Sequence, residues 1–281
     1  MDRSLSTSPE AGAPESRPIV PRPASTVIVV RDGAGGRPET FMVRRNPNSR
    51  FAADAFVFPG GAVEDGDHLA GGVPPCSGLT IPEAHRRLTE RGSDAPDEHG
   101  LSLALYVAAV RELFEEAGIL LARDLGQGGA AEITSETAAR LTVLRPEIQA
   151  GRRSLTTTVS DLGLELVPEE LIYFSHWITP EASPRRFDTR FFMIEDRPGQ
   201  VASHCGVETA DGAWVTPGEM LARFERDEIT LVSVTVDHLR LLDTFASAGD
   251  LLAFARTKPI RTVRARRNRE GWDLGGDGAP W

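Results

Sequence analysis

Residues 101–120, LSLALYVAAVRELFEEAGIL, decide the fold. Apolar side chains recur through this stretch at the spacing of an α-helix, so the sequence predicts a helix that buries one face in a core. The apolar face comprises Leu103, Tyr106, Val107, Val110, Leu113, Phe114 and Ala117, and the opposite face carries Glu112, Glu115 and Glu116.

The three glutamates are the first candidate functional group. Carboxylates three or four residues apart on a helix repel one another by about 0.2–0.5 kcal/mol per pair. Such an acidic face is usually just solvated. The alternative is a site for a hard divalent cation, Mg²⁺ or Mn²⁺, because these ions prefer oxygen ligands.

Two flanking motifs favour the cation site. Residues 111–119, RELFEEAGI, resemble the second half of the Nudix box, and residues 58–67, FPGGAVEDGD, resemble its first half, with Asp67 in place of the family's glutamate. The chain places 43 residues between Asp67 and Arg111, where the family has seven. We therefore expect an insertion of 36 residues inside the box.

The insertion and a second motif resemble one branch of the Nudix hydrolases, which includes the peroxisomal coenzyme A diphosphatases. Arg45 and Arg50 precede the FPGG turn at the spacing of that branch's coenzyme A signature, while Asn46 and Asp54 depart from it. Residues 177–180, WITP, and 185–192, RRFDTRFF, also resemble the branch, so that the resemblance covers most of residues 25–256.

The resemblance implies a set of site residues. Arg111 is expected to hold the glutamate carboxylates through a bidentate pair, and Asp67 to support that network with a shorter reach, so that Asp67→Glu should preserve or raise activity. The implied metal ligands are the Gly61 carbonyl, Glu112, Glu115 and Glu116. Substrate contacts are expected from Arg45, Arg50, Phe58, Gly60 and Arg186. The general base is left open between Glu208 and the acids of residues 94–98.

Composition describes a soluble globular enzyme. The 281 residues amount to one large domain or two small ones. No apolar run approaches the roughly 20 residues that span a bilayer, and the N-terminus lacks the apolar core of a signal peptide, so we expect a cytoplasmic protein. A net charge of −10 argues against a general nucleic-acid binder.

Cysteine and lysine are both scarce. Cys76 and Cys205 are too few for a disulfide framework, so reduced thiols are expected. Lys258 is the only lysine. Any diphosphate must therefore be bound by arginines, whose planar guanidinium groups bind phosphate through two hydrogen bonds.

Along the chain we expect a disordered leader at residues 1–22, a domain at residues 23–256 and a poorly ordered tail at residues 257–281. The domain contains the insertion at residues 68–100 and an extra helical segment at about residues 130–165. Strands are predicted at residues 24–30, 40–45, 55–58, 171–177, 190–194, 201–207 and 213–215, and helices at residues 81–91, 101–118, 135–149, 154–162, 217–224, 233–246 and 250–255. This order predicts the α/β class, an α/β/α sandwich with a mixed sheet, which agrees with the Nudix-type fold.

Some features have more than one interpretation. The insertion can be a lid, a dimer contact or padding, so a homodimer is possible. The glycine turn either is a plain turn or allows close backbone approach to a ligand. His176 and His238 are expected to be structural. Arg185, Arg186 and Arg190 bind either the substrate or the acids of the domain itself.

The leading hypothesis is a Mg²⁺- or Mn²⁺-dependent hydrolase of a small-molecule diphosphate, with coenzyme A or an acyl derivative as the substrate. Nucleotide sugars, dinucleotides and nucleoside triphosphates are alternative substrates. The alternative from another class is a catalytically silent domain that binds a nucleotide and regulates a partner. The intact set of Arg111, Glu112, Glu115 and Glu116 argues against silence.

Overall fold

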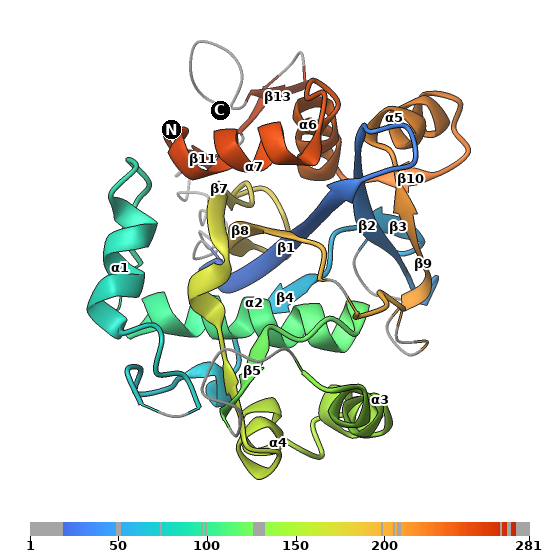
Figure 1. Cartoon of the computed structure of the whole chain (residues 1–281). Helices are drawn as coiled ribbons and strands as arrows, with labels where there is room; N and C mark the ends of the chain where they lie inside the picture. The colour runs from blue at the N-terminus through green and yellow to red at the C-terminus, as the bar shows by residue number, and fades with distance from the viewer. Residues whose placement is uncertain are drawn as a thin grey trace, which may run out of the picture.

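A mixed β-sheet lies at the centre of the molecule, between two layers of helices (Figure 1). The computed structural model describes residues 19–48, 52–73, 75–96, 98, 100–125, 133–197, 199–204, 206 and 209–264, together with the backbone of residues 266–268 and 271–273.

The sheet holds nine strands in the described part of the chain. Its main path runs through β10 (Thr230–Leu231), β3 (Ala55–Val57), β2 (Pro38–Arg45), β1 (Arg22–Asp32), β8 (Phe187–Glu195), β7 (Ile172–Ile178) and β11 (Thr262–Arg264), while β4 (Gly60–Ala62) pairs with β1 and β9 (Thr209–Val215) pairs with β2. β1 and β2 form the predicted hairpin, with Val30 opposite Thr40. β1 is also parallel to β8, so the sheet is mixed, as predicted.

Helices cover both faces of this sheet (Figure 1). α2 (Leu101–Ala117) lies along one face, and α5 (Pro217–Glu225), α6 (Ser233–Leu242) and α7 (Ala248–Thr257) pack on the other. Around α2 lie α1 (Ile81–Thr89), α3 (Ser135–Gln149), α4 (Leu155–Asp161) and a small sheet of β5 (Ala122–Asp124) and β6 (Leu164–Leu166). The predicted α/β/α sandwich is confirmed. Near the C-terminus, β12 (Arg266–Asn268) pairs with β13 (Gly271–Asp273).

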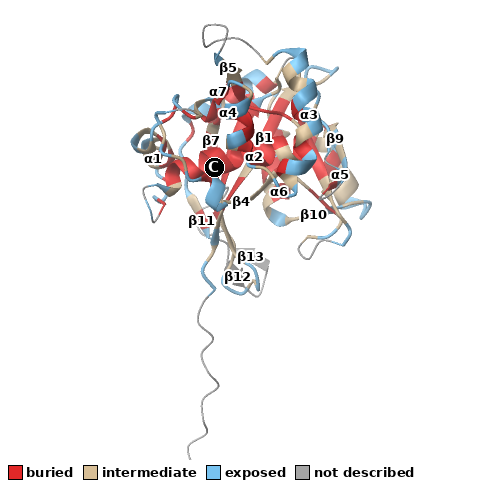
Figure 2. Cartoon of the chain, turned by 90° about the horizontal axis from the view of Figure 1, so that it is seen from below, coloured by how far each residue is buried: buried red, intermediate tan, exposed pale blue. Residues whose placement is uncertain are grey.

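The first strand shows why the sheet needs helices on both faces. Successive residues of a strand point to opposite faces. Val27 and Val29 belong to the core beneath α2, and Ile28 and Val30 belong to the core beneath α6 and α7. Figure 2 shows the buried residues gathered along α2 and β1. An unbroken apolar run is therefore the pattern expected of a strand that is covered on both sides.

α2 begins and ends close to its predicted bounds, and Gly118 closes it with a left-handed φ of +72°. The prediction of a single buried face is wrong. Glu112 is 7% exposed and Glu116 is 3% exposed, so the acidic face is buried as well. The reason is that β4 and the turn that follows it pack against this face. Among the described helices, none has both the length and the apolar character needed to cross a membrane.

The strand predicted at residues 201–207 does not form in the described part of that segment. The N–H of Ser203 donates to the carbonyl of Ala117 (2.9 Å), and Arg145 Nη2 donates to the carbonyl of Ser203 (2.8 Å). The backbone therefore bonds to the end of α2 and to a side chain of α3 instead of to a neighbouring strand.

The predicted domain boundaries are too narrow at both ends. β1 begins at Arg22, and the carbonyl of Ile19 accepts a hydrogen bond from Arg186 Nη1 (2.6 Å), so the end of the predicted leader belongs to the domain. In the predicted tail, β11 adds a parallel strand beside β7. The buried side chains of Ile260 and Val263 explain why this segment packs on the domain.

The insertion also forms hydrogen bonds with the rest of the domain. Its Arg91 carbonyl accepts a hydrogen bond from the N–H of Ile260 (2.8 Å), and Arg91 Nη1 donates to the carbonyl of Ala255 (2.5 Å). At its other end, the N–H of Ser77 donates to Glu165 Oε1 on β6 (2.7 Å). The insertion is thus packed against the C-terminal segment and the small second sheet.

Candidate active site

A cavity of about 990 Å³ lies over β4, β1 and β8. Strand register sets its floor, because Thr26 of β1 lies opposite Gly60 of β4 and beside Phe191 of β8. Alternate residues on either side of these three share the same face. The floor residues are Arg22, Ala24 and Thr26 of β1, Gly60 and Ala62 of β4, and Phe187, Thr189 and Phe191 of β8.

The glycine turn brings the first half of the box against α2. The N–H of Gly60 donates to Glu116 Oε2 (3.0 Å). A Cβ atom at Gly61 would lie 2.3 Å from Glu112 Oε1, and one at Gly60 would lie 2.5 Å from the carbonyl oxygen of Ser25. Only glycine permits so close an approach. Gly61 is therefore needed for packing against Glu112, and Gly60 for packing against β1, beyond forming a turn.

Arg111 joins the two halves of the box. Its Nε and Nη2 donate to the two carboxylate oxygens of Asp67 (2.9 and 3.0 Å), and Nη2 also donates to the carbonyl of Ala62 (2.9 Å). Nη1 donates to Glu112 Oε1 (2.9 Å) and Glu115 Oε2 (3.3 Å). The predicted bidentate pair exists, but its partner is Asp67 and not a glutamate. Burial opposes the charge on Arg111, yet the surrounding carboxylates outweigh burial and raise the pKa of this guanidinium.

Asp67 is 1% exposed and ends the short helix η1 (Asp65–Asp67), which follows closely after β4. Besides Arg111, its carboxylate accepts a hydrogen bond from the N–H of Glu64 (2.8 Å). The shorter acid therefore reaches Arg111 because η1 carries its backbone close to α2.

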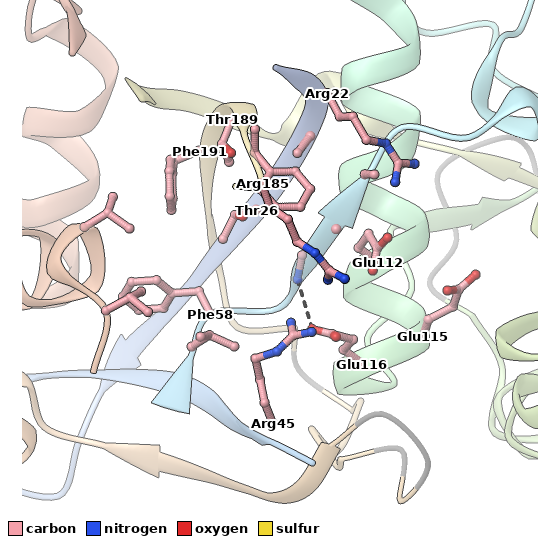
Figure 3. A pocket seen from close by; sticks show the side chains of 18 of the residues that line it. Arg22, Thr26, Arg45, Phe58, Glu112, Glu115, Glu116, Arg185, Thr189 and Phe191 are labelled. Carbon is pink, nitrogen blue, oxygen red and sulfur yellow. Dashed lines mark hydrogen bonds between the residues drawn. The ribbon is translucent and has the colours of Figure 1, made fainter. Parts of the chain in front are cut away.

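Glu112, Glu115 and Glu116 line the cavity from α2 (Figure 3), and Gly61 lies against Glu112. All these donors are oxygen atoms, the ligand type that Mg²⁺ and Mn²⁺ prefer. Within the described residues, no three Asp, Glu, His or Cys side chains form a ready cluster for a metal ion. Arg111 donates hydrogen bonds to Glu112 and Glu115, and the N–H of Gly60 donates to Glu116. The donor set fits a divalent ion, whose binding would replace some of these hydrogen bonds.

Three arginines line the cavity near the glutamates: Arg22 at the start of β1, Arg45 at the end of β2 and Arg185 in the turn before β8. Figure 3 shows their guanidinium groups reaching toward Glu112 and Glu116. Arg45 Nε is buried and has no hydrogen-bond partner in the part of the chain that the structure describes. This end of the cavity thus combines acids suited to a cation with guanidinium groups suited to phosphate.

The predicted substrate contacts are only partly brought together. Arg45, Phe58 and Gly60 line the cavity, and Arg50 lies outside the described residues. Arg186 does not line the cavity, because its Nε donates to the carbonyl of Thr179 (3.0 Å) and its Nη1 reaches the N-terminal segment. Its neighbour Arg185 lines the cavity instead.

From the glutamates the cavity extends along the aromatic side chains of Phe58, Trp177 and Phe191 to the first turn of α6. This turn contributes four residues to the lining: Val232, Ser233, Val234 and Thr235. No described residue of the insertion lines the cavity.

None of the described candidates for the general base lines the cavity. Glu208 and Asp97 fall outside the described residues, and neither Asp94 nor Glu98 lines the cavity. Asp94 forms an ion pair with Arg264. Glu64, which follows β4, is the one further carboxylate in the described lining.

The buried histidines are structural, as expected. His176 Nε2 lies 2.5 Å from Asp188 Oδ1, and Asp188 also pairs with the buried Arg190. His238 is held between Ser175 and Val234. Burial lowers the pKa of both imidazoles, that of His238 to about 3.

Sequence reasoning missed Arg22, Glu64 and the start of α6. Arg22 could have been found by extending the first strand two residues toward the N-terminus, because alternation then places it on the face of Ala24 and Thr26. The start of α6 carries no motif, and only the tertiary structure brings it to the cavity.

The chain resembles known proteins both in sequence and in structure. The family model for the NUDT19 Nudix domain matches residues 22–242. The chain is 30% identical to the acyl-coenzyme A diphosphatase NUDT19 of Gallus gallus, over 85% of this chain and 72% of that protein, and 27% identical to that of Homo sapiens, over 76% and 62%. The crystal structure of a NUDIX hydrolase from Alicyclobacillus acidocaldarius superimposes with a TM-score of 0.61 at 27% identity, covering 85% of this chain and 97% of that one.

Proposed function

This chain belongs to the NUDT19 Nudix domain family, and on that premise we propose that it hydrolyses the diphosphate linkage of coenzyme A or an acyl-coenzyme A with the help of a divalent ion, Mg²⁺ or Mn²⁺. The expected products are adenosine 3′,5′-bisphosphate and 4′-phosphopantetheine or its acyl derivative.

One observation carries the proposal. Arg22, Arg45 and Arg185 reach into the same end of a cavity as the three glutamates of α2. A diphosphate bridged by a divalent ion needs cationic groups for its oxygens and acids for the ion. The aromatic side chains beyond this end offer apolar surface to the remainder of a long, nucleotide-containing substrate.

The chain's own residues have distinct tasks in this proposal. The three cavity arginines bind the phosphate oxygens and orient the diphosphate. Arg111 keeps Glu112 and Glu115 in place, and Asp67 fixes Arg111. The Gly60 N–H orients Glu116. When bound, a divalent ion supplies charge neutralisation at the phosphates and lowers the pKa of a water molecule.

A substrate screen tests the proposal. The protein is incubated with coenzyme A, an acyl-coenzyme A, dephospho-coenzyme A, a nucleotide sugar, a dinucleotide and a nucleoside triphosphate, each with Mg²⁺ or Mn²⁺, and the products are identified by mass spectrometry. We expect cleavage of the coenzyme A compounds at the diphosphate. If only another diphosphate compound is cleaved, that compound replaces coenzyme A as the proposed substrate. Nucleotide binding without any cleavage would support the alternative of a catalytically silent regulatory domain.

A further inference from the structure

The first turn of α6 presents unused hydrogen-bond donors to the cavity. Its N-cap residue is Val232, whose side chain makes no capping hydrogen bond. In the described part of the chain, the N–H groups of Ser233 and Val234 have no acceptor. The N-terminus of a helix carries partial positive charge, and its free N–H groups bind anions.

The hydroxyl group of a largely buried residue, Thr235, lies beside these donors. Thr235 is 2% exposed and lines the cavity. Its hydroxyl makes no hydrogen bond to another described residue and is not one of the fully buried side-chain atoms that lack a partner, so it is open to the cavity. An unpartnered hydroxyl at the edge of a cavity is suited to an oxygen atom of a ligand.

Among the other described α-helices, all but α2, whose N-cap is Gly100, begin with a side-chain cap. α1, α3, α4, α5 and α7 each begin at a Ser or Thr whose hydroxyl accepts from an N–H of the first turn. These residues are Thr80, Thr134, Ser154, Thr216 and Ser247. At α6 a valine takes this place, which leaves the donors available to a ligand.

His238 holds this turn in position. Its Nδ1 lies 2.7 Å from the Val234 carbonyl and its Nε2 lies 2.7 Å from Ser175 Oγ. The carbonyl can only accept, so Nδ1 carries the proton and Nε2 accepts from the serine hydroxyl. Burial lowers the pKa of His238 to about 3, which keeps the ring neutral. The ring also stacks on Phe191, with centroids 4.4 Å apart.

The first turn of α6 lines the same cavity as the glycine turn. Phe58, whose ring centroid is 6.1 Å from that of His238, stands two residues before Gly60, and Gly60 donates to Glu116. Phe58 thus contacts α6 through His238 and leads directly into the glycine turn. A group attached to the substrate a few bonds from its diphosphate can reach both.

We propose that the first turn of α6, with the Ser233 and Val234 N–H groups and the Thr235 hydroxyl, binds a second phosphate group of the substrate, a phosphomonoester such as the 3′-phosphate of coenzyme A. This inference rests on the proposed function. Arg45 lies among the glutamates, where the diphosphate is expected, so the additional phosphate needs donors of its own.

Thr235→Val removes the hydroxyl and keeps the shape of the side chain. A hydrogen bond to a charged phosphate is strong, so kcat/KM for coenzyme A should fall about tenfold or more, mainly through KM. The loss for dephospho-coenzyme A, which lacks the 3′-phosphate, should be several-fold smaller. Thr235→Ser restores the hydroxyl and should restore the preference for coenzyme A. Equal losses on both substrates, or no loss on either, would overturn the inference and leave the diphosphatase activity standing.

Ser233→Asp separates phosphate binding from helix stability. An acid at the first position of a helix is favourable to the helix itself, so the melting temperature should stay unchanged or rise. The same charge repels a phosphate, so the preference for coenzyme A over dephospho-coenzyme A should fall. Thr216→Val at the N-cap of α5, outside the cavity lining, is the matched control: it should lower the melting temperature and leave the preference unaltered.

A binding measurement does not depend on hydrolysis. Titration calorimetry should show that the wild-type protein binds adenosine 3′,5′-bisphosphate about tenfold more tightly than AMP, and that Thr235→Val abolishes the difference. If coenzyme A is not cleaved but this difference is found, the proposed function fails and the phosphate subsite stands. If coenzyme A is cleaved and the wild-type protein binds both nucleotides equally, the subsite fails and the function stands.

Discussion

Arg111 and Asp67 form a buried bidentate pair, with N–O distances of 2.9 and 3.0 Å, across the 43 residues that separate them in the sequence. This pair brings the glycine turn and the glutamate helix together. The insertion therefore leaves the box intact in space, although it separates the two halves along the chain.

The pair overturns the sequence-based expectation for Asp67→Glu. Asp67 is 1% exposed and its two carboxylate oxygens already accept three hydrogen bonds, so an added methylene would overpack the site at a cost of about 1–3 kcal/mol. We predict that Asp67→Glu lowers both the unfolding free energy in urea and the turnover, the latter by about tenfold. Asp65→Glu, at an exposed position of the same short helix, is the control. Turnover at or above the wild-type rate would instead restore the earlier expectation.

Glu112→Gln, Glu115→Gln and Glu116→Gln each remove one negative charge and keep the side-chain shape. We predict that each variant retains its circular dichroism spectrum and loses more than about a hundredfold in turnover, or ~2.7 kcal/mol of barrier stabilisation. Mn²⁺ affinity, measured by electron paramagnetic resonance, should fall in parallel. Glu147→Gln, at an exposed position of α3 outside the cavity lining, should behave as wild type. Normal Mn²⁺ affinity in all three variants would contradict the metal assignment.

Gly61→Ala tests the close approach of the turn to α2. The new Cβ would lie 2.3 Å from Glu112 Oε1, so this carboxylate must move. We predict a loss of at least about tenfold in kcat, read in a steady-state assay with saturating divalent ion. Gly35→Ala is the matched control, because a Cβ there meets no atom within 4 Å. Full activity in Gly61→Ala would show that Glu112 tolerates displacement.

Arg45→Ala tests which phosphate this arginine binds. Its position among the glutamates predicts contact with the diphosphate. We expect kcat/KM to fall about ten- to a hundredfold, and by the same factor for coenzyme A and dephospho-coenzyme A. A loss confined to coenzyme A would assign Arg45 to the 3′-phosphate and weaken the case for α6.

The buried side chain of Lys258 should make the free energy of unfolding depend on pH. The side chain is 3% exposed, and burial lowers its pKa from 10.5 to about 8. Below pH 8 both the folded and the unfolded states are protonated, and the penalty for burying the charge is complete. Between pH 8 and 10.5 the unfolded state binds more protons, so stability should rise with pH, by roughly 3 kcal/mol over this window.

Lys258→Met keeps the aliphatic stem and removes the titrating group. The difference in unfolding free energy between this variant and the wild-type protein should therefore shrink steadily from pH 8 to pH 10. A difference that does not change with pH would show that the lysine is accommodated as a cation.

The sequence could predict what local patterns determine. The unbroken apolar run of residues 27–30 and the helical spacing within residues 101–120 led to the sandwich, and the box residues led to the glutamates. Long-range contacts could not be predicted in this way. Periodicity marks Glu116 as exposed, and only the packing of β4 on α2 buries it.

Neighbouring residues of the same type show the same limit of prediction from sequence. Arg185 and Arg186 are indistinguishable by composition, yet only the first lines the cavity, because the second binds the N-terminal segment. Likewise, residues 201–204 have the composition of a strand but bond to α2 and α3. The direction in which a side chain points at these positions depends on which distant segment of the chain packs against it.

Joining Asp67 to Arg111 across so long a segment also determines when the site can form during folding. A compact box could assemble early, as a local unit of turn and helix. Here the closure of a longer loop costs more chain entropy, and contacts between residues far apart in sequence slow folding. The insertion itself packs against β6 and the C-terminal segment, so its contacts also span long stretches of chain. Recovery of activity on refolding should therefore follow, and never precede, the burial of the core.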